Sequence, residues 1–220
     1  MITQERAKTY FTEKKPGIIG AILMFLATAL MLYSLTNGWN IWKLVAACVF
    51  ILVGIGLIKM RNRYPSDAEI DASFIELKDI KAGLSLDKLG ISKEDIVREP
   101  LKVLGVYNYQ YEKVGDDGLM RYNPVQVEIM HFGKNQLFVN TADVDLINQD
   151  AYVGKTNEFF YKDISAVSIQ DSDNTKRFVI KVSGETELDV AIYCNDQDSL
   201  RSAEEAVNVI RKILREIKSV

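Results

Sequence analysis

Two long apolar runs near the N-terminus dominate the hydrophobic pattern of the chain. The first extends from Gly17 to Leu35. The second extends from Ile41 to Ile58, with Lys43 as its one charged residue. A bilayer core of about 30 Å requires about 20 apolar residues in a helix, and the short connection at 36–40 is rich in turn formers. The pattern therefore predicts a two-helix transmembrane hairpin over residues 17–63.

Basic residues flank the outer ends of these runs. Seven Lys and Arg residues lie there, against one in the turn, and the positive-inside rule then places both chain ends in the cytoplasm. We expect a multi-pass protein of the cell membrane in which residues 1–16 form a cytoplasmic tail. A cleaved signal peptide fits less well, because the triplet 27–29 that resembles a cleavage site lies inside the first run and a second run follows.

Residues 64–100 read as a helical linker. Ser66 and Glu69 have the spacing of a capping box, which predicts a helix that extends to Lys81 and ends at Gly83. A second, shorter helical stretch is expected after Ser92. The pattern does not say whether these elements pack on the rest of the chain or on another copy.

The period of the pattern changes to two from Leu101 onward, which predicts about seven antiparallel strands joined by short loops. A helix follows from about Asp196 to Lys218. It has an apolar stripe that includes Val207, Ile210 and Leu214, and we expect this stripe to pack on the strands rather than form a coiled coil. Residues 101–220 contain enough apolar positions for a core of their own.

Two segments resemble strands of the pleckstrin-homology-like (PH-like) family. The segment Glu158–Ile169 is similar to its aromatic strand pair, and Gln136–Asn140 is similar to the preceding strand. With the apolar runs, the chain resembles membrane-anchored bacterial PH-like proteins.

The stretch Leu146–Thr156 reads as an insertion of unassigned role. The resemblance implies an α+β fold in which a transmembrane hairpin precedes a curved antiparallel β-barrel or sandwich, capped by the C-terminal helix. It also implies binding or scaffolding.

Phosphoinositide recognition is not expected, although some members of that family have it. Such domains place several basic residues on the first hairpin, which here is Glu112–Arg121. Asp116 and Asp117 lie in this hairpin, and their charge opposes an anionic headgroup.

Charge is distributed unevenly along the chain. Residues 1–63 contain eight Lys and Arg but two Asp and Glu, whereas residues 64–220 contain 19 basic and 28 acidic residues. An acidic C-terminal part argues against nucleic-acid binding. Cys48 and Cys194 are not expected to form a disulfide, in line with a reducing compartment.

No catalytic constellation is present in the sequence. His131 is the single histidine, and neither a second histidine nor an acid pair at ligand spacing accompanies it. Asp143, Asp145 and Asp150 could hold a hard cation, but a solvated loop fits better, and residues 171–174 read as a turn. We therefore expect no enzyme, no cofactor and no metal site.

Tyrosines at alternate positions are the most informative polar feature. Tyr107, Tyr109 and Tyr111 share one face of a predicted strand, and Tyr122 follows. They either line the barrel core or form a partner surface, since tyrosine is enriched at protein interfaces. The leading hypothesis is a non-enzymatic, membrane-tethered interaction or scaffolding module that self-assembles or binds a protein partner. The alternative is a regulatory sensor of lipid or a small ligand.

Overall fold

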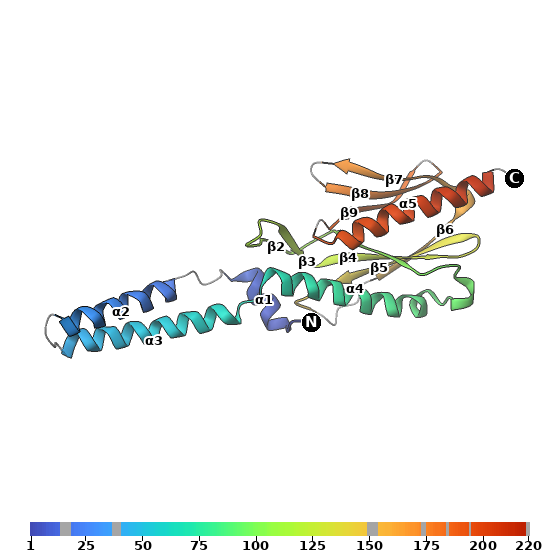
Figure 1. Cartoon of the computed structure of the whole chain (residues 1–220). Helices are drawn as coiled ribbons and strands as arrows, with labels where there is room; N and C mark the ends of the chain where they lie inside the picture. The colour runs from blue at the N-terminus through green and yellow to red at the C-terminus, as the bar shows by residue number, and fades with distance from the viewer. Residues whose placement is uncertain are drawn as a thin grey trace. The chain divides into compact units, whose positions relative to one another are not determined.

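A computed structural model describes residues 1–13, 19–36, 41–148, 154–172, 175–183, 185–193 and 195–218. The chain divides into two compact units (Figure 1). Residues 5–66 form the helical unit. Residues 1–4 and 67–220 form the sheet unit.

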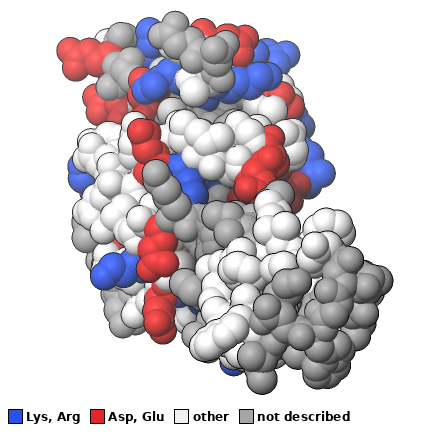
Figure 2. Space-filling view, turned by 90° about the vertical axis from the view of Figure 1, so that its left-hand side faces the viewer, with Lys and Arg blue, Asp and Glu red and all other residues white. Residues whose placement is uncertain are grey.

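The helical unit consists of α1 (Gln4–Thr12), α2 (Ile19–Thr36) and α3 (Ile41–Arg63). Helices α2 and α3 lie side by side (Figure 1). Large apolar side chains on them are exposed, as in Phe25 at 74 % and Trp42 at 76 %. At the lower right of Figure 2, the side chains drawn for described residues are almost all uncharged.

Tyr64 connects the two ends of the helical unit. Its hydroxyl donates hydrogen bonds to the backbone carbonyls of Tyr10, at 2.8 Å, and Glu13, at 3.0 Å. Its ring lies 5.8 Å from the ring of Tyr10. Helix α1 is therefore tied to the segment that follows α3.

Within the part of the chain that the structure describes, no helix has both the length and the apolarity to cross a membrane. Helix α2 has 18 residues, which at 1.5 Å per residue measures about 27 Å against about 30 Å for a bilayer core. Helix α3 is longer, but Lys43 lies near its start and basic residues occupy its last turns. This finding contradicts the predicted transmembrane hairpin over 17–63. It also contradicts the predicted multi-pass location in the cell membrane with both termini cytoplasmic.

The sheet unit is built on seven antiparallel strands in the order β6-β5-β4-β1-β9-β8-β7. Two more strands, β2 and β3, pair only with each other. The strands are β1 (Leu101–Val106), β2 (Tyr111–Val114), β3 (Met120–Asn123), β4 (Val125–Phe132), β5 (Gln136–Val144), β6 (Gly154–Phe160), β7 (Ile164–Ser172), β8 (Thr175–Val182) and β9 (Glu185–Ile192). A short 3₁₀ turn, η2 (Tyr161–Asp163), joins β6 to β7. The predicted antiparallel α+β architecture of this part is confirmed.

Helix α5 (Gln197–Lys218) packs on one face of the sheet. Val207, Ile210 and Leu214 are buried in one apolar cluster with Met130 and Phe132 of β4. Because these positions contact the sheet, α5 is a capping helix, as its apolar stripe predicts. The C-terminal helix therefore supplies part of the core of this unit.

Helix α4 (Asp67–Leu89) packs on the opposite face of the sheet. Residues on this face alternate along β4 with those that face α5, and one of them, His131, is hydrogen-bonded to Ser85 of α4. The predicted helix end at Gly83 is wrong, because α4 continues to Leu89 and ends before Gly90, whose φ of +65° favours glycine. Ser92 caps the short turn η1 (Lys93–Asp95). The segment 67–89 thus belongs to the sheet unit.

Glu128 of β4 is a buried carboxyl on the face of the sheet that packs against α5. It is 2 % exposed, and its Oε2 accepts a hydrogen bond from the Thr141 hydroxyl at 2.6 Å. Burial, together with the nearby carboxylate of Asp143, raises its pKa from 4.5 to about 7, although the Thr141 hydrogen bond acts in the opposite direction. The folded chain therefore holds this proton more tightly than the unfolded chain.

We expect this carboxyl to make stability fall with rising pH. Because the pKa of Glu128 is higher in the folded chain than in the unfolded chain, its proton contributes to the free energy of unfolding. This contribution is complete below about pH 4.5 and is lost as the pH rises through about 7. The shift corresponds to roughly 3 kcal/mol. Thermal melting from acid to mildly alkaline pH should show Glu128→Gln gaining stability relative to the unmodified chain above neutrality, but not below about pH 5. Parallel pH profiles of the two proteins would contradict this expectation.

Candidate interaction surface

The four tyrosines lie outside the core of the sheet unit. Tyr107 and Tyr109 lie in the loop after β1 and are 54 % and 44 % exposed, while Tyr111 in β2 and Tyr122 in β3 are half-buried. The rings of Tyr109 and Tyr122 are 4.6 Å apart between centroids. The structure therefore brings together two of the four and shows that none of them fills the core.

The β2–β3 hairpin supports this tyrosine pair. Its strands pair from Tyr111 with Asn123 to Val114 with Met120, and a turn over 115–118 closes it. Gly118 takes a φ of +80°, which favours glycine at that position. Val114 and Leu119 near the turn are exposed apolar side chains. The tyrosine face is defined here as Tyr107, Tyr109, Tyr122, Val114 and Leu119.

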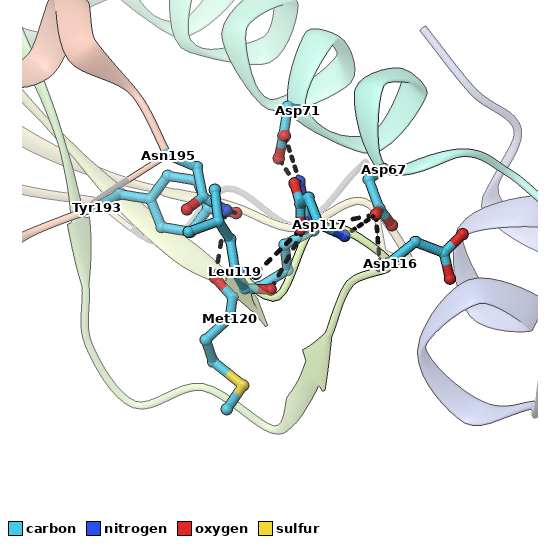
Figure 3. Close-up of polar contacts among 9 residues, drawn as sticks. Asp67, Asp71, Asp116, Asp117, Leu119, Met120, Tyr193 and Asn195 are labelled. Atoms are coloured by element: carbon cyan, nitrogen blue, oxygen red, sulfur yellow. Dashed lines mark hydrogen bonds and ion pairs between the residues drawn. The ribbon is translucent and has the colours of Figure 1, made fainter.

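Arg121 of β3 fixes the hairpin on the first turns of α4. Figure 3 shows Asp67 and Asp71 of α4 beside Asp116 and Asp117 of the hairpin turn. Its Nε and Nη2 donate to the two carboxylate oxygens of Asp71 at 3.0 and 2.7 Å. Its Nη1 and Nη2 donate to the two oxygens of Asp117 at 2.9 and 2.7 Å. Bidentate pairs of this kind fix orientation as well as adding energy. With Arg121 only 1 % exposed, this arrangement holds the hairpin in one orientation.

Asp67 at the start of α4 completes this contact. Its Oδ2 accepts a hydrogen bond from the backbone N–H of Asp116 at 2.7 Å and lies 3.9 Å from Nη1 of Arg121. A side chain at Gly115 would collide with the Arg121 guanidinium. A side chain at position 115 would therefore displace the Arg121 guanidinium and the carboxylates of Asp117 and Asp67 from their present positions.

The electrostatics of this contact depend on Arg121. Its hydrogen bonds hold the pKa of the Asp117 carboxyl well below its usual range, and the backbone N–H of Leu119 acts in the same direction. Asp117 thus binds an internal cation. The sequence suggested only that its charge would repel an anionic headgroup, and it did not reveal this pairing.

The other residues considered from the sequence lie apart from the tyrosine face or in different surroundings. His131 is buried beneath α4. Asp143 accepts a hydrogen bond from Gln126 at 3.3 Å, whereas Asp145 caps a turn through the backbone N–H groups of 147 and 148. No group of three His, Cys, Asp or Glu side chains among the described residues could hold a metal ion. Asp150, Cys194 and part of the segments 146–156 and 171–174 lie outside the described residues.

No model of a known protein family and no curated protein matches the chain. Apart from the helical unit, the surface in Figure 2 shows acidic and basic side chains interspersed. Among the described residues on the face drawn in Figure 2, both signs of charge are present, in contrast to the single-sign patch that is typical of nucleic-acid recognition.

Proposed function

We propose that the chain is a non-enzymatic interaction module of PH-like fold that binds a second protein chain through the tyrosine face. The observation that carries the proposal is the exposure of Tyr107 and Tyr109 next to a hairpin held in place by Arg121. Exposed tyrosines contribute large contact area at low cost in side-chain entropy. Because the hairpin is already fixed, binding need not order it.

The PH-like assignment is part of this proposal. Seven antiparallel strands followed by one C-terminal helix give the element order of that family, and α5 packs on one face of the sheet. The β2–β3 hairpin is an additional element outside the seven-stranded sheet. The support comes from element order and packing alone.

The partner we propose is a second copy of the chain. Glu112 of β2 lies opposite Tyr122 of β3 and therefore on the same face of the hairpin, and its carboxylate accepts a hydrogen bond from the Tyr109 hydroxyl. A patch of exposed aromatic and apolar side chains can pair with a copy of itself across a two-fold axis. Such pairing packs the exposed aromatic side chains of one copy against those of the other.

The sensor hypothesis has weaker support at this face. A cavity of about 240 Å³ lies beside Tyr107, with Gln126, Thr141 and Asp143 among its lining residues. This volume is below the range of about 300–1,000 Å³ that is typical of small-ligand sites. Protein binding is therefore the better candidate at the tyrosine face.

Replacing Tyr109 by Ser tests the proposal. We expect the purified full-length chain to self-associate with increasing concentration, and Tyr109→Ser to raise the dissociation constant at least about tenfold, as for an aromatic hot spot. Sedimentation velocity over a concentration series measures both quantities. Phe160→Ser is the matched control, because Phe160 of β6 is 47 % exposed and lies outside the tyrosine face.

Two results would contradict the proposal. One is a chain that stays monomeric at every concentration. The other is self-association of equal strength in Tyr109→Ser and the unmodified chain, as expected if the exposed apolar side chains of the helical unit drove association.

A further inference from the structure

Strand β7 forms one edge of the seven-stranded sheet (Figure 1). It pairs with β8 on one side, and no strand among the described residues pairs with its other side. The unpaired backbone groups of an edge strand are a template for another chain, and folded proteins usually protect such edges with Lys, Pro or a bulge. Strand β7 contains no Lys, Arg or Pro, and its one register shift lies at its start, between Ile164 and Ala166. The rest of this edge lacks these forms of protection.

The register between β7 and β8 indicates which backbone groups of β7 face outward. Ser172 pairs with Thr175, and two residues connect them. The closing pair of such a hairpin is hydrogen-bonded, and hydrogen-bonded pairs alternate with pairs whose groups point away from the partner strand. Counted back from Ser172, the N–H and C=O groups of Asp171, Ile169 and Val167 therefore point away from β8.

Arg211 of α5 covers one of these outward-facing groups. Its Nη2 donates to the Val167 carbonyl at 3.1 Å, which agrees with the direction derived from the register. In the part of the chain that the structure describes, no other hydrogen bond reaches the outward-facing groups of Val167, Ile169 or Asp171. The exposed side chain of Asp171 has no basic partner there, and Arg211 has no carboxylate partner. This edge therefore offers backbone donors and acceptors together with one charge of each sign.

We propose that the β7 edges of two copies of the chain pair antiparallel across a two-fold axis at Ile169, which joins their sheets. This register pairs Ile169 with Ile169 of the other copy and Val167 with Asp171. It is the only two-fold register that pairs the three outward-facing residues among themselves. It also places Ser168 opposite Gln170, so no like charges lie opposite each other at these positions.

Charge complementarity supports this register. Side chains at alternate positions of a strand share a face, so Asp171 lies on the same face as Val167, which is buried in one apolar cluster with α5. The register places Asp171 of one copy opposite Val167 of the other, where Arg211 of that copy lies. The two-fold axis repeats this contact. Each copy thus supplies the carboxylate that the other copy's Arg211 lacks.

A proline in the edge tests the pairing. Ile169→Pro removes an outward-facing N–H but none that faces β8, and edge strands tolerate proline at such positions. In the full-length Tyr109→Ser chain, whose tyrosine face is weakened, we expect dimers. Adding Ile169→Pro should raise the dissociation constant at least about tenfold, because the two-fold axis makes each loss count twice. Sedimentation velocity over a concentration series measures this constant, and circular dichroism checks the fold.

Ile169→Val is the matched control for the proline variant. It keeps the N–H and an apolar side chain, and should dimerise like its Tyr109→Ser parent. Equal dimerisation of the Ile169→Pro and Ile169→Val chains would overturn the proposal, since it would mean that the β7 edge takes no part in association.

Two charge reversals test the register without changing a backbone group. Asp171→Arg brings two positive charges together and Arg211→Asp brings two negative charges together, so each variant alone should dimerise at least about tenfold more weakly. An equimolar mixture of the two variants restores opposite charges at both contacts and should form dimers as tight as those of the parent chain. A contact within one copy could not produce this recovery. A mixture that associates no better than the separate variants would overturn the proposal.

The β7 edge and the tyrosine face are independent interfaces, and single variants separate them. Two different two-fold interfaces on each copy would link the copies into an open linear assembly. We expect Tyr109→Ser and Ile169→Pro each to stop at a dimer, and the double variant to be monomeric. A monomeric Tyr109→Ser chain would overturn the β7 proposal. A monomeric Ile169→Pro chain would support it and count against the tyrosine face.

Discussion

Replacing Ile210 by Asp is expected to unfold the sheet unit. Ile210 is fully buried in the cluster that joins α5 to the sheet. Loss of a large apolar side chain from a core costs about 2–5 kcal/mol, and burying an unpaired carboxylate adds at least a comparable amount. Since a domain is stable by only about 5–15 kcal/mol, this one change removes most of that margin. Circular dichroism should show loss of the cooperative melt.

Asn208→Asp is the matched control for this prediction. It introduces the same charge two residues away, at an exposed position of α5, and should leave the melting temperature within a few degrees of the unmodified chain. A folded Ile210→Asp chain of reduced oligomeric mass would instead mean that α5 acts mainly in assembly.

Removing α4 is expected to have an effect of similar size. Ile70 and Phe74 of α4 are fully buried, and the Phe74 ring packs 5.8 Å from that of Tyr193. Lys78 pairs with Asp196 at 2.5 Å, and both side chains are buried. A chain that starts at Leu101 leaves these partners exposed or uncompensated, at a cost of about 3–5 kcal/mol for the broken buried ion pair alone.

A pair of truncations measures this contribution. The chain that starts at Asp67 should melt cooperatively, whereas the chain that starts at Leu101 should melt without cooperativity or aggregate. These outcomes differ from the expectation from composition, in which residues 101–220 are sufficient to fold on their own. Identical cooperative melts for the two truncations would show that α4 is dispensable.

The sequence predicts α5 well, because helical periodicity directly encodes which side chains are buried. The spacing of Val207, Ile210 and Leu214 places all three on one face of a helix. That face is the one in contact with the sheet. The strands β4, β5, β7 and β8 are predicted for the corresponding reason, with period two.

Local pattern is less informative about where the backbone leaves an element. The alternation that begins in β1 continues through Tyr107 to Tyr111, so the sequence predicts one strand, but Asn108 takes a φ of +46° and the chain turns out of the sheet. Similarly, Gly83 lies inside α4, and the later Gly90 ends it. A glycine in the middle of a helix lowers the stability of the helix by about 1 kcal/mol. Helix α4 nevertheless continues past Gly83, and side chains beyond that position, such as Ser85, are buried.

The contact that fixes the hairpin of the candidate site is beyond sequence patterns. Arg121 meets Asp71 from 50 residues away, and nothing periodic connects an acidic helix start with a hairpin arginine. The apolar runs predicted membrane spans, but among the described residues no helix has both the length and the apolarity to cross a membrane.

The sheet unit includes residues that are synthesised long before the rest of it. The backbone N–H of Ile2 donates to the Ser73 hydroxyl at 3.0 Å across a separation of 71 residues, and Ile2 is buried there. At about 5–20 residues per second, Ser73 leaves the ribosome roughly 4–14 s after Ile2. The helical unit, including the bond from Tyr64 to Tyr10, has all its residues available before then. Residues 1–4 can therefore join the sheet unit only after the whole helical unit has been synthesised.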